Sequence, residues 1–169
     1  MLIRDAAPDD LPAIQRIYAH HVLHGVGSFE ETPPSLETML ARFDLVKSRG
    51  LPWLVGQMDG AITGYAYADL HRDRSAYRFT LEDAVYIAPS HARRGLGRAL
   101  LHEILARAQA GGFRQMIAVI GDSQNHGSIG LHAALGFRHI GTLPSVGFKF
   151  GRWLDSVIMQ KALQDGGGN

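Results

Sequence analysis

The sequence predicts an α/β fold, in which helices cover a sheet that contains parallel strands. Its second half alternates between strand patterns and helix patterns, which is the order that builds such layered folds. A near-continuous apolar run from Met116 to Gly121 is typical of a strand that is buried on both faces. Apolar residues also recur at helical spacing before that strand, so a long helix precedes it. The apolar face of this helix consists of Leu96, Leu100, Leu101, Ile104, Leu105 and Ala108.

The first half of the chain adds a short strand, two helices and a hairpin. Residues 2–6 have a strand pattern, and Asp9 is expected to cap a helix that follows them. Ser35 is expected to cap a second helix. Residues 53–57 and 61–68 flank an Asp-Gly turn and predict a hairpin. The residues expected to be buried in the two helices are Leu11, Ile14, Ile17 and Tyr18, and then Leu36, Met39, Leu40 and Phe43.

The remaining elements follow the same signals. A strand over residues 79–88 ends at a proline, and a Gly-Gly pair ends the long helix. A short helix over about 128–135 and two strands over 137–142 and 153–160 complete the chain. Because no linker divides these elements, we expect one domain over residues 1–163 and a flexible tail over 164–169.

Composition narrows the classes of function. The 169 residues carry a net charge of +1, so no overall field would attract nucleic acid or a membrane. The absence of cysteine excludes disulfides, thiolate metal sites and a cysteine nucleophile. The nine histidines have no spacing typical of a metal site, so we expect no metal. The start of the chain lacks a signal-peptide pattern, and a cytoplasmic enzyme is expected.

A basic, glycine-containing turn lies between the strand over 79–88 and the long helix. The N-terminus of a helix presents unpaired N–H groups and a partial positive charge. Gly95 and Gly97 would let the backbone approach a bulky anion, and Arg93 and Arg94 add charge. The turn therefore indicates a pyrophosphate site, although a tight connection with two solvated arginines is an alternative explanation.

The stretch from Ala84 to Phe137 resembles the GNAT acetyltransferase superfamily. The resemblance rests on Val85-Tyr86-Ile87-Ala88-Pro89, on Arg93-Arg94-Gly95-Leu96-Gly97, on Asn125 and on Leu131-His132-Ala133-Ala134-Leu135-Gly136-Phe137. It implies a mixed, twisted sheet of roughly six to seven strands with helices on both faces. It also implies that a splayed parallel strand pair binds acetyl-CoA. The implied contacts of acetyl-CoA are Val85, Tyr86, Ile87, Arg93, Arg94, Gly95, Leu96, Gly97, Arg98, Asn125, Ser128 and His132.

One position of the turn departs from the family. Ala92 stands where the family usually has glutamine or arginine. This difference removes one side-chain contact to the pyrophosphate, but it leaves the backbone N–H groups unchanged.

A closer resemblance runs over nearly the whole chain. The segment from Gly147 to Asp155, together with Gly64-Tyr65-Ala66-Tyr67-Ala68 and Ala118-Val119-Ile120-Gly121, is similar to the phosphinothricin and methionine sulfoximine/sulfone N-acetyltransferase branch. This resemblance implies acetylation of the α-amine of a small amino-acid-like inhibitor, which detoxifies it. It also implies a homodimer.

The acceptor is expected to be small and anionic for a chemical reason as well. Arg72, Arg74 and Arg78 precede the strand over 79–88, and arginine binds carboxylate, phosphinate or sulfoximine oxygens well. Solvated loop arginines are the alternative. Phe29 and Tyr77 are expected to form an apolar wall, although Phe29 is equally interpreted as a packing residue.

Acetyl transfer requires a base, because an α-amine is mostly protonated at neutral pH. Glu82 is the candidate, with a salt bridge to Arg78 as the alternative. A backbone N–H of residues 85–87 is expected to stabilise the oxyanion. His132 is expected to contact the cofactor or protonate the leaving thiolate, with capping or packing as the alternative. Lys149 either faces the acceptor or lies on the surface, and we favour the surface.

Two other functions remain open from the sequence. One is the acetylation of a different amine, such as an ordinary amino acid, a polyamine or a protein N-terminus. The arginine cluster disfavours polyamines, since like charges repel. The other is a non-catalytic protein that binds acyl-CoA and regulates a partner.

Overall fold

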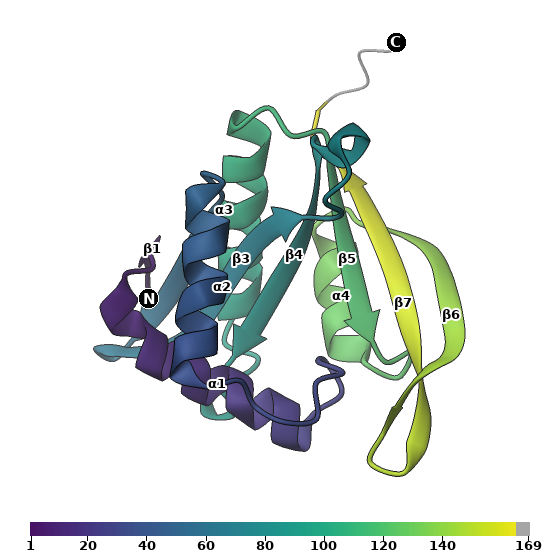
Figure 1. Ribbon diagram of the computed structural model, residues 1–169, viewed down its shortest axis with the longest axis horizontal. Coiled ribbons are helices and arrows are strands. Elements are labelled where there is room, and N and C mark those ends of the chain that lie inside the picture. Colours follow the sequence, from purple (N-terminus) through teal and green to yellow (C-terminus); the bar gives the residue numbers. More distant parts are fainter. Residues whose placement is uncertain (165–169) are drawn as a thin grey trace.

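The computed structural model describes residues 1–164, and seven strands form one mixed sheet there (Figure 1). The strands lie in the order β1-β2-β3-β4-β5-β7-β6. Their bounds are β1 (Leu2–Asp5), β2 (Trp53–Met58), β3 (Ala61–Leu70), β4 (Thr80–Ile87), β5 (Gln115–Gly121), β6 (Arg138–Lys149) and β7 (Arg152–Ala162). The expected α/β fold with a mixed sheet is confirmed.

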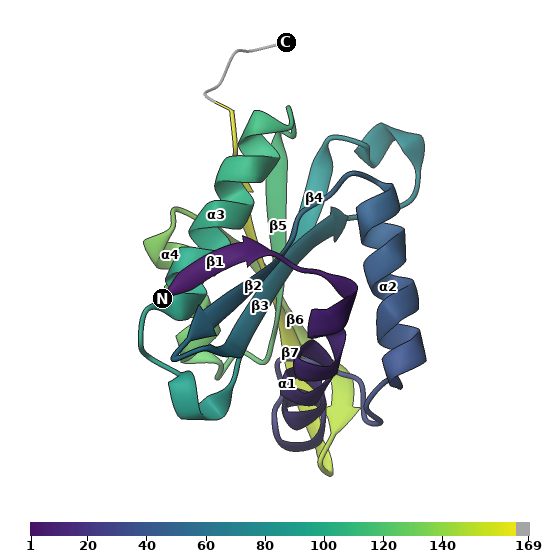
Figure 2. The ribbon, with the colours of Figure 1, turned by 90° about the vertical axis from the view of Figure 1, so that its left-hand side faces the viewer.

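Helices cover both faces of the sheet. Figure 2 shows α1 and α2 on one side of the strands and α3 and α4 on the other. The α-helices are α1 (Leu11–His24), α2 (Leu36–Ser48), α3 (Leu96–Ala110) and α4 (His126–Ala134). Three 3-10 turns are η1 (Pro8–Asp10), η2 (Ser75–Tyr77) and η3 (Pro89–His91). No helix within residues 1–164 is long and apolar enough to cross a bilayer.

The core lies between the sheet and these two helix layers. The apolar face predicted for α3 is fully or almost fully buried, as the helical spacing required. On the opposite face of the sheet, the ring of Trp53 stacks on Tyr67 at 4.2 Å, and Phe43 of α2 packs against Trp53 at 5.4 Å. These contacts hold β2 and β3 rigidly beside β4, which carries the site.

The feature that positions the site is the pairing of β4 with β5. These two strands are parallel, and they pair only where Thr80–Glu82 lies beside Gln115–Ile117. Beyond Glu82 the two strands diverge toward their carboxyl ends, as Figure 1 shows. β4 remains paired with β3 from Leu81 to Ile87. The divergence therefore leaves one edge of β4 without a strand partner.

Several local predictions differ from the structure. Asp9 does not cap α1. Instead, the carboxylate of Asp10 accepts the N–H of Ala7 at 2.8 Å and binds Arg4 at 2.7 Å. Leu36 and Leu40 are 47% and 39% exposed because only one side of α2 packs on the protein. The capping role of Ser35 is confirmed, since its hydroxyl accepts the N–H of Thr38.

The end of the chain also differs from its prediction. β6 extends from Arg138 to Lys149, well beyond the predicted residue 142, and forms a long hairpin with β7. Residues 165–169, which make up most of the predicted tail, lie outside the described part of the chain. The side chain of Gln164 donates to the carbonyl of Gln109 at 3.0 Å.

Candidate active site

A large cavity occupies the space where β4 and β5 diverge. Its volume is about 1060 Å³, and it runs between the carboxyl halves of the two strands. Residues 82–87 of β4 and 118–121 of β5 form its walls, and α1 and α4 contribute to its two sides. The predicted contacts Val85, Tyr86 and Ile87 all line it. The cavity thus follows the free edge of β4, where an extended molecule can bind in place of a strand.

The basic turn lies at the carboxyl end of β4, beside this cavity. Gly95 is the N-cap of α3 and has a φ of 84°, and Arg93 has a φ of 61°. Alternation of such conformations along a turn directs successive N–H groups to one side and forms an anion site. The first backbone hydrogen bond of α3 joins the N–H of Ala99 to the carbonyl of Gly95 at 3.1 Å. The N–H groups of residues 96–98 precede that bond and are therefore available to an anion.

The side chains of this turn separate into two kinds. Arg93, Arg94 and Arg98 are exposed, and within residues 1–164 none of them has a hydrogen-bonded partner. Leu96 is 1% exposed and belongs to the core, so only its backbone can contact a ligand. A Cβ on Gly97 would lie 3.5 Å from Leu131 Cδ2, which lines the cavity.

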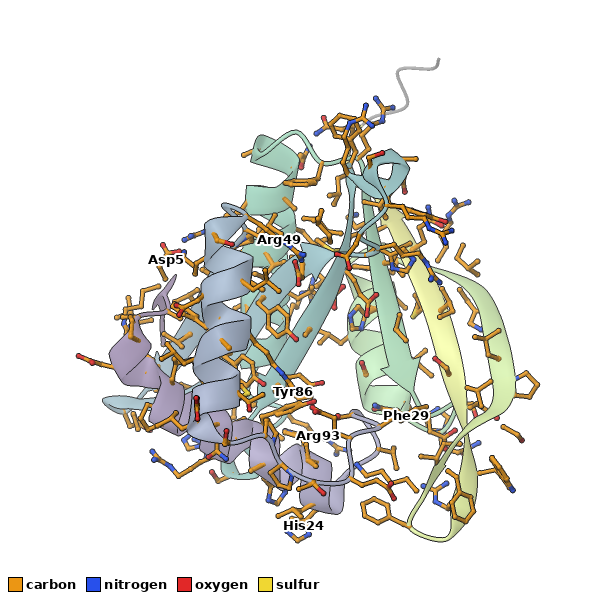
Figure 3. All side chains as sticks on the ribbon, viewed as in Figure 1. Asp5, His24, Phe29, Arg49, Tyr86 and Arg93 are labelled. Carbon is orange, nitrogen blue, oxygen red and sulfur yellow. The ribbon has the colours of Figure 1, made fainter. Side chains whose placement is uncertain are left out.

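Alternation along β4 sends neighbouring side chains to opposite faces of the sheet. Tyr86 points toward α1, where its ring meets that of Tyr18 at 5.0 Å. Figure 3 shows Tyr86 near the carboxyl end of β4 and Phe29 near that of β5. The Nε2–H of His21, also on α1, donates to the carbonyl of Ile87 at 2.8 Å. These contacts fix the end of β4 against α1.

Glu82 shares the face of Tyr86 and lies at the point where β4 and β5 begin to diverge. Its carboxylate is 3.0 Å from Nδ1 of His71, and its side chain is 38% exposed. Burial raises the pKa of Glu82 above its ordinary value, while His71 opposes this shift. The alternative of a salt bridge with Arg78 is wrong, because that guanidinium donates to the Ser75 carbonyl and lies over the ring of Phe79.

A second, smaller cavity of about 480 Å³ lies beside His71, the residue that contacts Glu82. Arg72, Arg74 and Tyr77, which the sequence singled out, line it together with His71 and Asp73. Neither guanidinium has a hydrogen-bonded partner among the described residues. Both arginines are therefore free to bind an anionic group there. Arg78 lines neither cavity.

His132 is 4% exposed and is held at both ring nitrogens. Its Nδ1–H donates to the carbonyl of Ser128 at 2.7 Å, and its Nε2 is 3.0 Å from Oδ1 of Asp83. Burial disfavours the charged ring, but Asp83 outweighs this effect, so the pKa of His132 is raised. Two acceptor atoms at this distance need a proton between them, so the contact with Asp83 contains one.

Asn125 and Ser128 stand at the start of α4 and line the large cavity. The side-chain oxygen of Asn125 accepts the N–H of Ser128 at 3.2 Å, and its Nδ2 donates to the Gly121 carbonyl at 2.9 Å. Asn125 is thus the N-cap of α4 and ties this helix to the end of β5. Its contact with the cofactor remains a prediction.

The loop over residues 25–34 closes one side of the large cavity. The ammonium group of Lys149 donates to the carbonyls of Gly25 and Ser28 at 2.9 and 2.7 Å. The interpretation of Lys149 as a surface residue is wrong, because it is 2% exposed. Its ammonium group binds these two carbonyls and does not line either cavity.

Phe29 packs in the same region. Cβ atoms added to Gly121 and Gly147 would lie 2.4 and 2.5 Å from its ring, so the ring lies directly on these two glycines. Val26 and Gly27 of the same loop line the cavity, whereas Phe29 does not. The alternative of a packing residue therefore describes Phe29 better than the proposed acceptor wall.

Two residues of the site were missed by sequence reasoning. Asp83 follows Glu82 directly, and strand alternation alone would have placed it on the opposite face, toward α4. His71 carries no such signal, because its contact with Glu82 depends on the register of β3 and β4. Within residues 1–164, no group of three histidines, aspartates or glutamates is arranged to hold a metal ion.

Comparisons with known proteins agree with the cavity and the basic turn described above. Residues 14–137 match the acetyltransferase (GNAT) family. A phosphinothricin N-acetyltransferase of Alcaligenes faecalis is 57% identical over 164 residues, which make up 97% of this chain and 83% of that relative. An L-methionine sulfoximine/L-methionine sulfone acetyltransferase of Salmonella typhimurium strain LT2 is 40% identical over 165 residues, 98% of this chain and 96% of the relative.

The fold has a close solved counterpart as well. A crystal structure of a GNAT superfamily phosphinothricin acetyltransferase from Sinorhizobium meliloti, in complex with acetyl-CoA, superimposes with a TM-score of 0.95. The two chains are 47% identical, and the match covers 98% of this chain and 90% of the other. These findings confirm the resemblance that the sequence motifs indicated.

Proposed function

This chain belongs to the GNAT acetyltransferase family, whose acyl donor is acetyl-CoA, and we propose that it acetylates the α-amine of a small, anionic amino-acid-like acceptor. Phosphinothricin, methionine sulfoximine and methionine sulfone are the acceptors that its relatives' names indicate. The observation that carries the proposal is the arginine-lined cavity, which adjoins the large cavity at His71, the residue that contacts Glu82.

Acetyl-CoA binds along the free edge of β4. The diphosphate takes the N–H groups at the start of α3, and Arg93 and Arg94 add charge. The pantetheine arm pairs with the backbone of Val85 and Ile87 as an added strand would. This placement directs the thioester toward Glu82, where the free edge of β4 begins.

The acceptor's acidic group binds Arg72 and Arg74 in the smaller cavity. This leaves its α-amine near Glu82, on the side that faces the thioester. The paired guanidinium groups favour an anionic acceptor and oppose a polyamine.

Glu82 provides the carboxylate of the general base. After losing a proton, the amine nitrogen attacks the thioester carbon, and a backbone N–H of residues 85–87 stabilises the oxyanion. The C–S bond then breaks, and the thiolate takes a proton. We assign that proton to His132, which lines the large cavity and whose pKa Asp83 raises.

The test is a panel of acceptors with acetyl-CoA, monitored by release of free thiol. We expect turnover with at least one of the three inhibitors and none with spermidine. Glu82→Gln should lower kcat/KM by at least about tenfold, since a positioned base contributes roughly 10²–10⁴-fold. Turnover that is equal in the wild type and Glu82→Gln would remove Glu82 from the mechanism. No turnover with any amino-acid-like acceptor would refute the proposed substrate class.

We also propose that the enzyme is a homodimer joined through the β6–β7 hairpin. Exposed apolar residues of this size mark association surfaces in soluble proteins. The hairpin exposes Ile140, Leu143, Val146, Phe148, Phe150 and Trp153, each more than half accessible. Light scattering should give twice the mass of one chain for the wild type and one chain for Trp153→Lys. A wild-type monomer would contradict this part of the proposal.

The proposal also includes the cellular location of the enzyme and its role in detoxification. A cytoplasmic location fits a chain without cysteine that uses acetyl-CoA. Acetylation removes the charge of the acceptor's amine, so an inhibitor that mimics an amino acid would lose one of its recognised groups. Expression of the chain should therefore protect bacteria against phosphinothricin, and unchanged sensitivity would contradict a detoxifying role.

A further inference from the structure

His71 lies at the junction of the two cavities. Of the described residues, it is the one that lines both the large cavity between β4 and β5 and the small cavity of Arg72 and Arg74. Under the proposed function, the acyl donor fills the large cavity, and the acceptor's acidic group fills the small one. The amine of the acceptor must then lie between the two cavities, next to the imidazole of His71.

Three contacts fix the orientation of this imidazole. The backbone N–H of His71 donates to the carbonyl of Thr80 at 3.1 Å, which anchors the residue at the end of β3. The ring of Tyr77 meets the imidazole edge to face, with centroids 6.0 Å apart. Nδ1 lies 3.0 Å from Oε2 of Glu82, and this is the ring's one hydrogen bond within residues 1–164.

The contact with Glu82 determines which ring nitrogen is basic. An ionised carboxylate only accepts hydrogen bonds, so Nδ1 must carry the proton of that bond. The neutral ring then has its lone pair on Nε2, which is the atom remote from Glu82. A carboxylate that holds an imidazole by one nitrogen and leaves the other as a base is the arrangement found in hydrolytic triads.

We propose that His71 is the second member of the general base: Glu82 orients the ring through Nδ1–H, and Nε2 accepts the proton of the acceptor's ammonium group. This inference rests on the proposed function, because it requires an amine acceptor. The N–H bond of the ammonium breaks, its electron pair stays on nitrogen, and the proton forms a bond with Nε2. The resulting imidazolium faces the carboxylate of Glu82 and later releases the proton to solvent, to which its side chain is 20% exposed.

Other charged groups around the pair affect its titration. Asp69 lies directly opposite Glu82 on β3, and Arg49 binds it at 2.6 Å, which offsets its charge. The connection after β3 contributes both signs of charge. The ionisable groups that face the pair are Tyr67 and Asp69 on β3 and Arg72, Asp73, Arg74 and Tyr77 on the connection. Asp83 lies on the opposite face of β4 and acts on Glu82 through its charge alone.

The test compares the pH dependence of kcat/KM in the wild type and in His71→Asn. The amide of asparagine provides an N–H near the position of Nδ1, so it retains a donor to Glu82 without a ring that titrates. We expect kcat/KM near pH 7.5 to fall by at least about tenfold. The acidic limb of the profile should move to lower pH, because Glu82 alone then accepts the proton. His102→Asn, an exposed substitution on α3, is the matched control and should leave the profile unchanged.

An unchanged rate and profile in His71→Asn would overturn the inference, as would a limb that moves to higher pH. A measurement on the wild type avoids any dependence on the folding of the variant. The imidazole of His71, followed by NMR, should titrate at the same pH as the acidic limb of kcat/KM. A difference of more than about one pH unit, equivalent to tenfold in proton affinity, would overturn it too. If the wild type acetylates no acceptor, the proposed function fails first; if it does and His71→Asn matches it, only the role of His71 fails.

Discussion

Replacing Lys149 by methionine tests how the loop over residues 25–34 is held beside the site. The ammonium group of Lys149 donates to the carbonyls of Gly25 and Ser28 from a position that is 2% exposed. Burial lowers the pKa of Lys149, which reflects the unfavourable removal of its charge from water. Methionine has a similar length and fills the same space, but it cannot donate to either carbonyl.

The expected loss of stability follows from these two hydrogen bonds. A hydrogen bond to a charged group contributes about 1.5–3 kcal/mol, and the pair would total roughly 3–6 kcal/mol. Removing the buried charge offsets part of this loss, because its desolvation no longer opposes folding. We therefore expect unfolding to become easier by about 2–4 kcal/mol. For a chain of this size, that corresponds to a Tm lower by roughly 4–16 °C.

The assay is chemical and thermal unfolding of Lys149→Met beside the wild type, with steady-state kinetics on both. Since Gly25 and Gly27 line the large cavity, in which acetyl-CoA is proposed to bind, loosening of the loop should also raise the KM of acetyl-CoA. Lys47→Met is the matched control, because Lys47 is an exposed lysine on α2 and should change stability by less than about 0.5 kcal/mol. A Tm of Lys149→Met within about 2 °C of the wild type would refute the structural role assigned to Lys149.

Three further substitutions test separate parts of the account. Gly97→Ala should leave the Tm unchanged or raise it, because the added Cβ would meet Leu131 Cδ2 at an ordinary distance of 3.5 Å. The same Cβ narrows the cavity, so the substitution should weaken CoA binding measured by calorimetry. Arg94→Ala should raise the KM of acetyl-CoA at low salt and less at high salt, because exposed charges are screened; equal effects would contradict a role in anion binding. Asp83→Asn should lower kcat. It should also lower the pKa of His132, measured by NMR, because the hydrogen bond and the charge of Asp83 raise that pKa. An unchanged pKa of His132 would refute the pairing of these two residues.

The sequence predicted well those elements whose pattern reflects local burial. The apolar face of α3 is buried as expected, and the apolar run of β5 is buried except for Val119, which is 41% exposed and lines the large cavity. Here the hydrophobic effect acts on one element at a time, and periodicity reports it directly. The capping role of Ser35 was predictable for the same reason, since a cap involves only the next few residues.

Predictions that depended on tertiary packing were less accurate. Leu36 and Leu40 have the spacing of buried residues, but α2 packs on one side only and leaves them exposed. Lys149 was interpreted as a surface residue because lysine is rarely buried. Its burial results from the long β6–β7 hairpin meeting the loop after α1, and the carbonyls of that loop lie far away in sequence.

The residues of the candidate site show the same difference between local patterns and tertiary contacts. Glu82 and the basic turn are candidates that the sequence alone provides, because their residue types and spacing suit the proposed chemistry. The partners of Glu82 and His132 were not found, because both contacts join different elements. His71 reaches Glu82 across the β3–β4 hairpin, and Asp83 reaches His132 from β4 to α4.

The proposed function depends on acetyl-CoA binding along the free edge of β4, with its diphosphate at the start of α3. A crystal structure of this chain with acetyl-CoA would show whether the cofactor lies there. We expect phosphate oxygens within hydrogen-bond distance of the N–H groups around Gly95 and Gly97, and the thioester beside Glu82. A diphosphate bound elsewhere, or a thioester remote from the carboxylate of Glu82, would contradict it.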